Sequence, residues 1–180
     1  MTITKKDLIE KIREDLKIDE PINESIVAQA KRFSLSTELL SDANKGNHVE
    51  LYDQYIKDFN RISAELDSVS RDDVSSNSSP FRSLKNDETY NLNAAYLHEL
   101  YFNNISDLQS QIKMDSLSYM RLSRDFGTFD EWQKDFIACC LASRCGWAMT
   151  YFNVYTQKYM NCVIDLHSLN VPVGAYPVIV

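Results

Sequence analysis

The stretch DFGTFDEWQKDF at residues 125–136, followed by ASRCGWA at 142–148, decides the fold. Thr128 and Glu131 have the spacing of a capping box, which predicts a helix over 128–142. The inward side of this helix would carry the aromatic residues Phe129, Trp132 and Phe136. After Gly146 the composition changes, which indicates a different kind of structure.

Residues 147–165 are dense in Tyr, Phe, Val, Thr and Ile without helical periodicity. This composition predicts a pair of strands with a turn near Gln157, although the turn lacks Gly or Asn. The final AYPVIV, residues 175–180, predicts a third strand beside this pair, covered by another chain because it is apolar on both faces. Helices followed by a small antiparallel sheet give an α+β fold class.

Toward the N-terminus, apolar residues at steps of three and four predict helices over 48–66 and about 89–105. These steps turn His48 and Tyr55 to one inward face and His98 to the inward face of the second helix. Two shorter helices are expected earlier, over 4–18 and from Pro21 through Phe33.

The pattern divides the chain into three parts. We expect a helical arm over 1–34, a helical hairpin domain over 35–110 with a polar linker at 68–80, and a truncated α/β domain over 111–180. Isolated helices as short as those of the arm are marginal in water. The arm should therefore pack on a partner or another copy, and deleting residues 1–33 should leave the rest folded.

The charge and composition of the chain argue against several classes of partner and location. The net charge of −7 argues against nucleic acid and anionic membranes as partners, and no apolar run approaches the ~20 residues of a membrane-spanning helix. The charged N-terminus lacks the apolar core of a signal peptide. We therefore expect a cytoplasmic protein, or one within a virion or other assembly, and not a secreted one. The cysteines lack zinc spacing and are interpreted as buried free thiols.

Together with two further stretches, this region resembles the iron/manganese superoxide dismutase family over roughly residues 35–180. Residues 125–148 are similar to the family signature FGSF…F…F…A…GSGWAW, although Met149 stands where the second Trp is usual. NAAYLHELYF at 93–102 resembles NAA…NHTFYW, the helix that carries the second histidine ligand of the family. His98 takes that ligand position.

The third match lies in the region of His48 and Tyr55. The residues up to His48 resemble the approach to the first histidine ligand, and YIKDFN from Tyr55 resembles YVNNLN, whose Tyr guards the metal funnel. This chain has one residue fewer between the two. Either a one-residue π-bulge of the family is lost here, or Asn47 occupies the ligand position and His48 points elsewhere. Leu51 or Tyr52 stands where the family has a second-sphere histidine.

The resemblance implies remnants of a metal centre, with His48 and His98 as ligands and Tyr55 and His167 as second-sphere candidates. The family completes its iron or manganese shell with an Asp and a third His from the motif LD.WEHAYY, and this sequence stops at Val180, just before it. Two neutral imidazoles hold iron or manganese weakly. No bound metal and no dismutase activity are therefore expected of the chain as given.

The function expected from these observations is that of a non-catalytic, superoxide-dismutase-like structural or docking subunit in a larger assembly of the virion or ribosome type. Its partners would be other protein subunits or further copies of itself. The alternative is an iron/manganese superoxide dismutase whose chain continues beyond Val180. A small-molecule role is not supported, because neither a Gly-rich phosphate loop nor a Ser-His-Asp grouping is visible.

Overall fold

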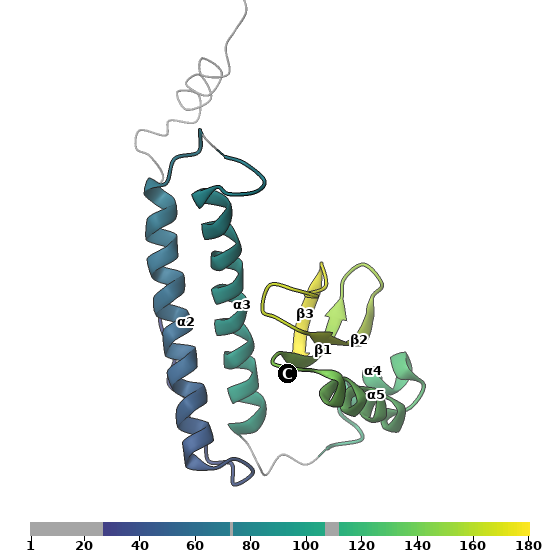
Figure 1. Cartoon of the computed structure of the whole chain (residues 1–180). Coiled ribbons are helices and arrows are strands. Elements are labelled where there is room, and N and C mark those ends of the chain that lie inside the picture. Colours follow the sequence, from purple (N-terminus) through teal and green to yellow (C-terminus); the bar gives the residue numbers. More distant parts are fainter. Residues whose placement is uncertain (1–26, 73, 107–111) are drawn as a thin grey trace, which may run out of the picture.

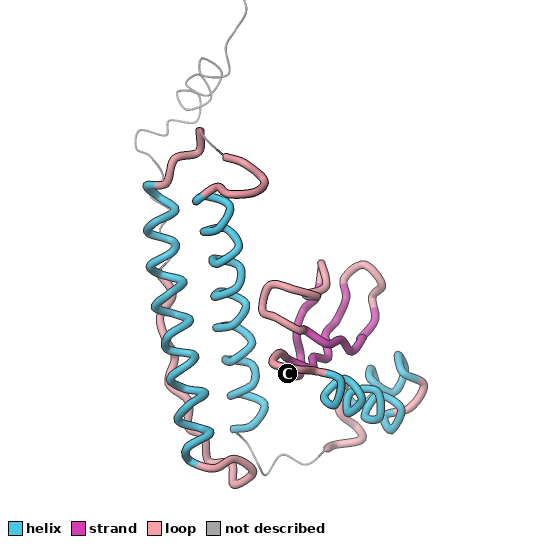
Figure 2. The backbone as a smooth tube through the Cα atoms, viewed as in Figure 1, coloured by secondary structure: helices cyan, strands magenta, loops and turns pink. Residues whose placement is uncertain are grey.

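A computed structural model of the chain describes residues 27–72, 74–106 and 112–180. Two long helices run side by side, and a small sheet with two shorter helices lies next to the second long helix (Figures 1 and 2). This confirms the α+β arrangement expected from the sequence. In chain order the elements are α2 (Asp42–Ser68), α3 (Pro80–Ser106), α4 (Leu117–Phe126), α5 (Phe129–Ala142), β1 (Trp147–Asn153), β2 (Lys158–Ile164) and β3 (Ala175–Ile179). Among the described helices, none is long and apolar enough to cross a membrane.

The helical hairpin of α2 and α3 starts both of its helices earlier than the apolar periodicity predicts. The Ser41 hydroxyl caps α2 by accepting a hydrogen bond from the Asn44 amide (3.2 Å), so the first turn precedes the apolar stripe. α3 begins at Pro80, a residue whose fixed φ suits the first helical turn. The two helices pack through a buried cluster of Tyr52, Ile56, Ala95 and Phe102.

Residues 27–37 are extended and follow α2, which corrects part of the predicted helical arm. The amide of Ala28 donates to Asn60 Oδ1 (2.8 Å), and Asn60 Nδ2 donates back to the Ala28 carbonyl (2.9 Å). The Lys31 amide donates to the Tyr52 hydroxyl (2.9 Å). Because these backbone groups bond to side chains of α2, the helix expected through Phe33 is wrong for residues 27–33. The helix expected over 4–18 lies outside the described residues.

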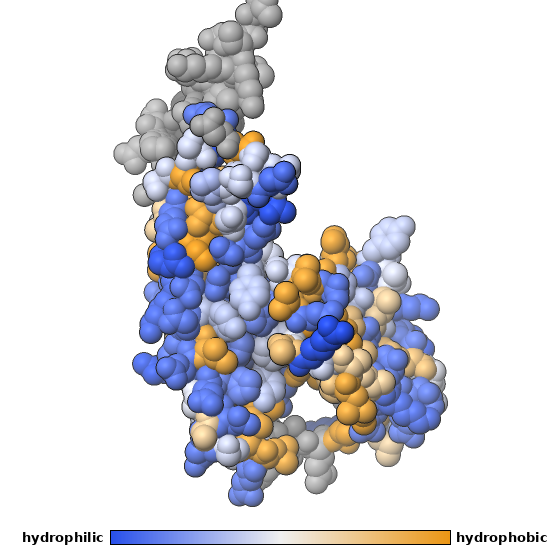
Figure 3. All heavy atoms as spheres, viewed as in Figure 1, coloured by the Kyte–Doolittle hydropathy of each residue, from blue (hydrophilic) through white to orange (hydrophobic). Residues whose placement is uncertain are grey.

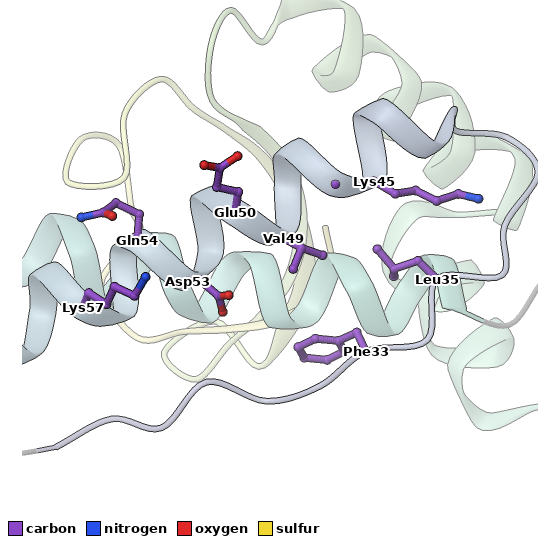
Figure 4. Close-up of a pocket in the computed structure, with 9 residues that line it drawn as sticks. Phe33, Leu35, Lys45, Val49, Glu50, Asp53, Gln54 and Lys57 are labelled. Atoms are coloured by element: carbon purple, nitrogen blue, oxygen red, sulfur yellow. The ribbon is translucent and has the colours of Figure 1, made fainter.

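A groove of about 530 Å³ separates this extended segment from α2. Figure 4 shows Phe33 and Leu35 on the extended segment turned toward Val49 on α2. Phe33 continues into the hairpin core, where its ring lies 5.9 Å from that of Tyr52 and 5.0 Å from that of Phe102. The segment therefore contributes side chains to the core of the helical hairpin.

Of the two short helices, one was predicted from the sequence and the other was not. α5 begins where it was predicted, because the Thr128 hydroxyl accepts from the Glu131 amide (3.1 Å). Only this half of the capping box forms, since the Glu131 carboxylate pairs with Lys134 instead (2.6 Å). α4 was not predicted; it is capped by the Ser116 hydroxyl, which accepts from the Tyr119 amide (3.2 Å).

The sheet has the strand order β2-β1-β3 and is antiparallel throughout. The strand pair and the third strand expected from the sequence are both present. The β1–β2 turn puts Gln157 in the left-handed region (φ 56°). Asn153 Oδ1 stabilises this turn by accepting from the amides of Tyr155 (2.9 Å) and Thr156 (3.0 Å).

Apolar side chains remain exposed on the sheet and on the loop that precedes β3. In Figure 3 hydrophobic atoms gather over this part of the molecule, whereas α2 is mainly hydrophilic in the same view. Val173 is 96% exposed and Tyr176 on β3 is 64% exposed. Covering of this surface by another chain stays a prediction.

Candidate metal centre

The three histidines of the chain, His48 on α2, His98 on α3 and His167 after β2, come together with Tyr55 in space. The ring centroid of His98 lies 5.9 Å from that of His48 and 6.2 Å from that of His167. Tyr55 lies 5.5 Å from His98 and 5.2 Å from His167, again between ring centroids. The structure thus gathers all four residues that the resemblance singled out.

The position of His48 depends on the register of α2. The helix is α-helical from Asp42 to Ser68, so His48 and Tyr55 are seven residues apart, two turns, and share one face. The His48 ring also lies 5.4 Å from that of Tyr101 on α3. Asn47 is exposed. Of the two registers left open by the sequence, the one that turns His48 toward His98 without a π-bulge is observed.

His98 is held in a state suited to binding a cation through one nitrogen. It is 3% exposed, and its Nδ1 lies 2.7 Å from the Ala94 carbonyl oxygen one turn earlier. A carbonyl can only accept, so Nδ1 carries the proton and Nε2 keeps its lone pair. Burial lowers the pKa of His98 to about 4, with smaller contributions from His48 and His167, so the ring is neutral at pH 7.

Three nearby polar atoms are buried and have no hydrogen-bond partner among the described residues. They are His48 Nδ1, His167 Nδ1 and Trp147 Nε1. The Trp147 ring lies 4.8 Å from that of His98 and 6.1 Å from that of His167, measured between ring centroids. Buried polar groups rarely stay unpaired without a functional reason or an unseen partner. This cluster therefore has the unsatisfied polar atoms that a bound ion with its solvent would satisfy.

The protein builds this site with support from two residues that sequence analysis missed. Tyr90 on α3 packs its ring 4.7 Å from that of His167, and Asn93 Nδ2 donates to the His167 carbonyl (2.6 Å). Tyr90 also adds to the effect of burial, which raises the pKa of Tyr55 to about 12. Extending the α3 stripe of Ala94 and His98 one turn backward would have found Tyr90.

The residues present fit part of a metal shell. Two imidazoles that bind one ion at about 2.1 Å would have ring centres roughly 4.5–6 Å apart. The 5.9 Å between His48 and His98 lies within this range. In the described part of the chain, no group of three or more His, Cys, Asp or Glu side chains is arranged to hold an ion. The site therefore supplies a pair of nitrogen ligands, with His167 and Tyr55 beside them.

Comparison with known proteins finds similar superoxide dismutases, while no model of a protein family matches the sequence. An iron superoxide dismutase of Aquifex aeolicus is 27% identical over 132 residues, covering 72% of this chain and 61% of the relative. An iron superoxide dismutase of Cupriavidus metallidurans is 28% identical, covering 73% and 64%. A manganese superoxide dismutase of Haloferax mediterranei is 29% identical over 91 residues, covering 51% and 62%.

The chain thus spans about three-fifths of the length of each of these three relatives. These relatives are consistent with the resemblance drawn from the sequence motifs. The chain is therefore similar, at 27–29% identity, to iron and manganese superoxide dismutases.

Proposed function

We propose that the chain carries the two-histidine half of an iron or manganese centre and serves superoxide dismutation. The observation that carries this proposal is the pairing of His48 with His98 across α2 and α3, with His98 neutral and its Nε2 lone pair available. The similar proteins are named as iron or manganese superoxide dismutases, which supports the alternative drawn from the sequence better than a purely structural role.

An iron or manganese ion, when bound, would supply the one-electron chemistry that superoxide dismutation requires. The chain's own residues would bind and surround it. His48 and His98 are the ligands, and the Ala94 carbonyl fixes the tautomer of His98. Tyr55 is protonated at neutral pH, and burial raises its pKa further, to about 12, so its hydroxyl remains a hydrogen-bond donor. His167 offers a further buried ring nitrogen.

The resemblance assigns the remaining ligands of the family, an Asp and a third His, to the motif LD.WEHAYY, which these 180 residues do not contain. Full activity would therefore require ligands in addition to the histidine pair. The second candidate function is the non-catalytic docking subunit. It is favoured by the exposed apolar side chains on and before β3, where Val173 is 96% exposed and Tyr176 is 64% exposed.

Metal binding separates the two candidates. The full chain is loaded anaerobically with Mn²⁺ or Fe²⁺, passed over a desalting column and assayed for metal content and for superoxide dismutation. The dismutase proposal expects retained metal that is lost in His48→Ala and in His98→Ala but kept in Leu92→Ala, which alters an exposed residue of α3. Metal content that is negligible, or unchanged by both histidine substitutions, would leave the docking role as the better account.

A further inference from the structure

A closed network of polar groups joins the extended segment to both histidine-bearing helices. The Lys31 amide donates to the Tyr52 hydroxyl (2.9 Å), and that hydroxyl donates to Glu99 Oε1 (3.0 Å). The other carboxylate oxygen of Glu99 pairs with the Lys31 ammonium group. Tyr52 is 1% exposed and the Glu99 side chain 15% exposed, so the hydrogen bond between them is shielded from water.

The network stands next to both proposed ligands. Tyr52 follows His48 by one turn of α2, and Glu99 is the residue after His98 on α3. Tyr52 also packs its ring edge-on against Phe102, one turn after His98, with 5.8 Å between ring centroids. The Tyr52–Glu99 hydrogen bond is therefore a polar link between α2 and α3 at the level of the histidine pair.

We propose that Tyr52 and Glu99 are positioning residues that hold His48 and His98 at their mutual distance and orientation, an inference that rests on the proposed metal site. Neighbouring residues on a helix are about 100° apart around its axis. A hydrogen bond at Glu99 therefore restricts rotation of α3, and with it the direction of His98. Tyr52 restricts α2 in the same way for His48.

A purely structural role would be to hold the extended segment on the hairpin, and the chain offers a matched control for that role. Asn60 binds the same segment through Ala28. It lies twelve residues beyond His48 on α2, about 18 Å along the helix axis at 1.5 Å per residue. Loss of Asn60 should loosen the segment without freeing the two histidines.

The test compares four variants of the full chain. Tyr52→Phe removes only the hydroxyl, Glu99→Leu removes the acceptor, Glu99→Gln keeps an acceptor for Tyr52, and Asn60→Ala is the control. The first readout is the set of histidine ring signals in ¹H–¹⁵N NMR spectra of the metal-free protein, where only three histidines contribute. The second is the affinity for Co²⁺ from its visible absorption, with His98→Ala defining the specific site. Thermal midpoints report stability.

We expect Tyr52→Phe and Glu99→Leu to shift the ring signals of His48 and His98 and to weaken Co²⁺ binding about tenfold or more, as loss of a group that supports a metal ligand typically does. Glu99→Gln should stay close to wild type. Asn60→Ala should lower the thermal midpoint while leaving ring signals and Co²⁺ affinity unchanged.

Two results would overturn the positioning role: unchanged ring signals in Tyr52→Phe, or equal changes in Tyr52→Phe and Asn60→Ala. If wild type shows no His98-dependent Co²⁺ binding, the metal site itself fails, and the ring signals alone decide whether Tyr52 and Glu99 position the histidines. If Co²⁺ binds through His98 and Tyr52→Phe changes neither readout, the metal site stands and the positioning role falls.

Discussion

At the scale of single residues, Gly146 shows why the turn into β1 tolerates no side chain. A Cβ added at this residue would lie 1.6 Å from the carbonyl oxygen of Ile164 and 2.7 Å from its carbonyl carbon. The obstacle is backbone of the neighbouring strand, which cannot rotate away as a side chain would. Gly46, in the first turns of α2, has no atom within 4 Å of the same position.

Gly146→Ala should therefore lower the free energy of unfolding by several kcal/mol, on the order of the larger values known for single substitutions. Gly46→Ala should raise it by about 0.5–1 kcal/mol, because alanine is the better helix former at an unobstructed site. Urea denaturation of both variants measures the two effects. A mild Gly146→Ala variant would show that the β1–β2 pair can shift to make room.

The buried His98 ring makes stability depend on pH. Its pKa falls from 6.5 to about 4 on folding, so the unfolded chain takes up a proton more readily than the folded one. Above pH 6.5 the ring is neutral in both the folded and the unfolded state, so the difference in pKa costs no stability. As the pH falls from 6.5 to about 4, only the unfolded chain takes up the proton, and the free energy of unfolding decreases. The loss amounts to about 3 kcal/mol at 1.36 kcal/mol per pKa unit.

Urea denaturation of the metal-free protein between pH 7 and 4 measures this dependence. His98→Gln should show a shallower decline than wild type, while carboxylates contribute equally to both proteins. Parallel profiles for the two proteins would contradict the assignment of a neutral, buried His98.

At the scale of elements, α5 is joined to the sheet by a chain of hydrogen bonds through Thr150. Trp132 Nε1 donates to the Thr150 hydroxyl (3.0 Å), which donates to Asn161 Oδ1 (2.6 Å). Asn161 Nδ2 then donates to Asp135 Oδ2 on α5 (2.9 Å). Thr150 is fully buried, so its hydroxyl and the groups bonded to it depend on one another rather than on water for hydrogen bonds.

Thr150→Val keeps the shape of the side chain but leaves Trp132 Nε1 without its acceptor and Asn161 Oδ1 without its donor. The free energy of unfolding should fall by about 1–3 kcal/mol, the cost of buried groups left unpaired. Thr150→Ser retains the hydroxyl and should lose less. If the valine variant is as stable as the serine variant, the hydrogen-bond chain contributes little to the docking of α5.

Elements with a strong local signal could be predicted from the sequence, and elements fixed by distant contacts could not. The Thr128 cap and the β-forming run after Gly146 located α5 and the strand pair. The apolar spacing from Pro21 through Phe33 suggested a helix that would include residues 27–33. In the structure their backbone bonds to Asn60 and to Tyr52, more than twenty residues away, and this overrides local propensity.

The same distinction holds for the site. Helical periodicity placed His48, Tyr55 and His98 on inward faces, and the antiparallel hairpin brings these faces together. Spacing alone could not decide whether His48 or Asn47 takes the ligand position, because these alternatives differ by a single residue in the helix. The Tyr52–Glu99 pair also escaped the sequence analysis, since its partners lie 47 residues apart.

At the scale of the whole molecule, the extended segment contributes to the hairpin core, which argues against the expectation that residues 1–33 can be deleted without loss of folding. Phe33 packs against Tyr52 and Phe102 in the same cluster that joins α2 to α3. Shortening the chain through residue 33 should therefore destabilise the helical hairpin.

Phe33→Ala isolates this contribution. Loss of a partly buried aromatic ring should lower the free energy of unfolding by about 2 kcal/mol, below the 3–5 kcal/mol of a fully buried ring. Leu39→Ala is the control, because Leu39 is 85% exposed and its loss should have little effect. The two variants are compared by urea denaturation of the full chain. Equal free energies of unfolding for Phe33→Ala and Leu39→Ala would show that the segment is peripheral to the core.

The side-chain anchoring of residues 27–37 also has a consequence for amide hydrogen exchange. Ala28 and Lys31 lie outside any helix or strand, yet their N–H groups donate to Asn60 and Tyr52, both on α2. Detaching the segment from α2 exposes both amides at once. In native-state exchange with deuterium they should therefore appear as two protected positions, and both should exchange at a free energy below that of global unfolding. Asn60→Ala should accelerate Ala28 far more than Lys31.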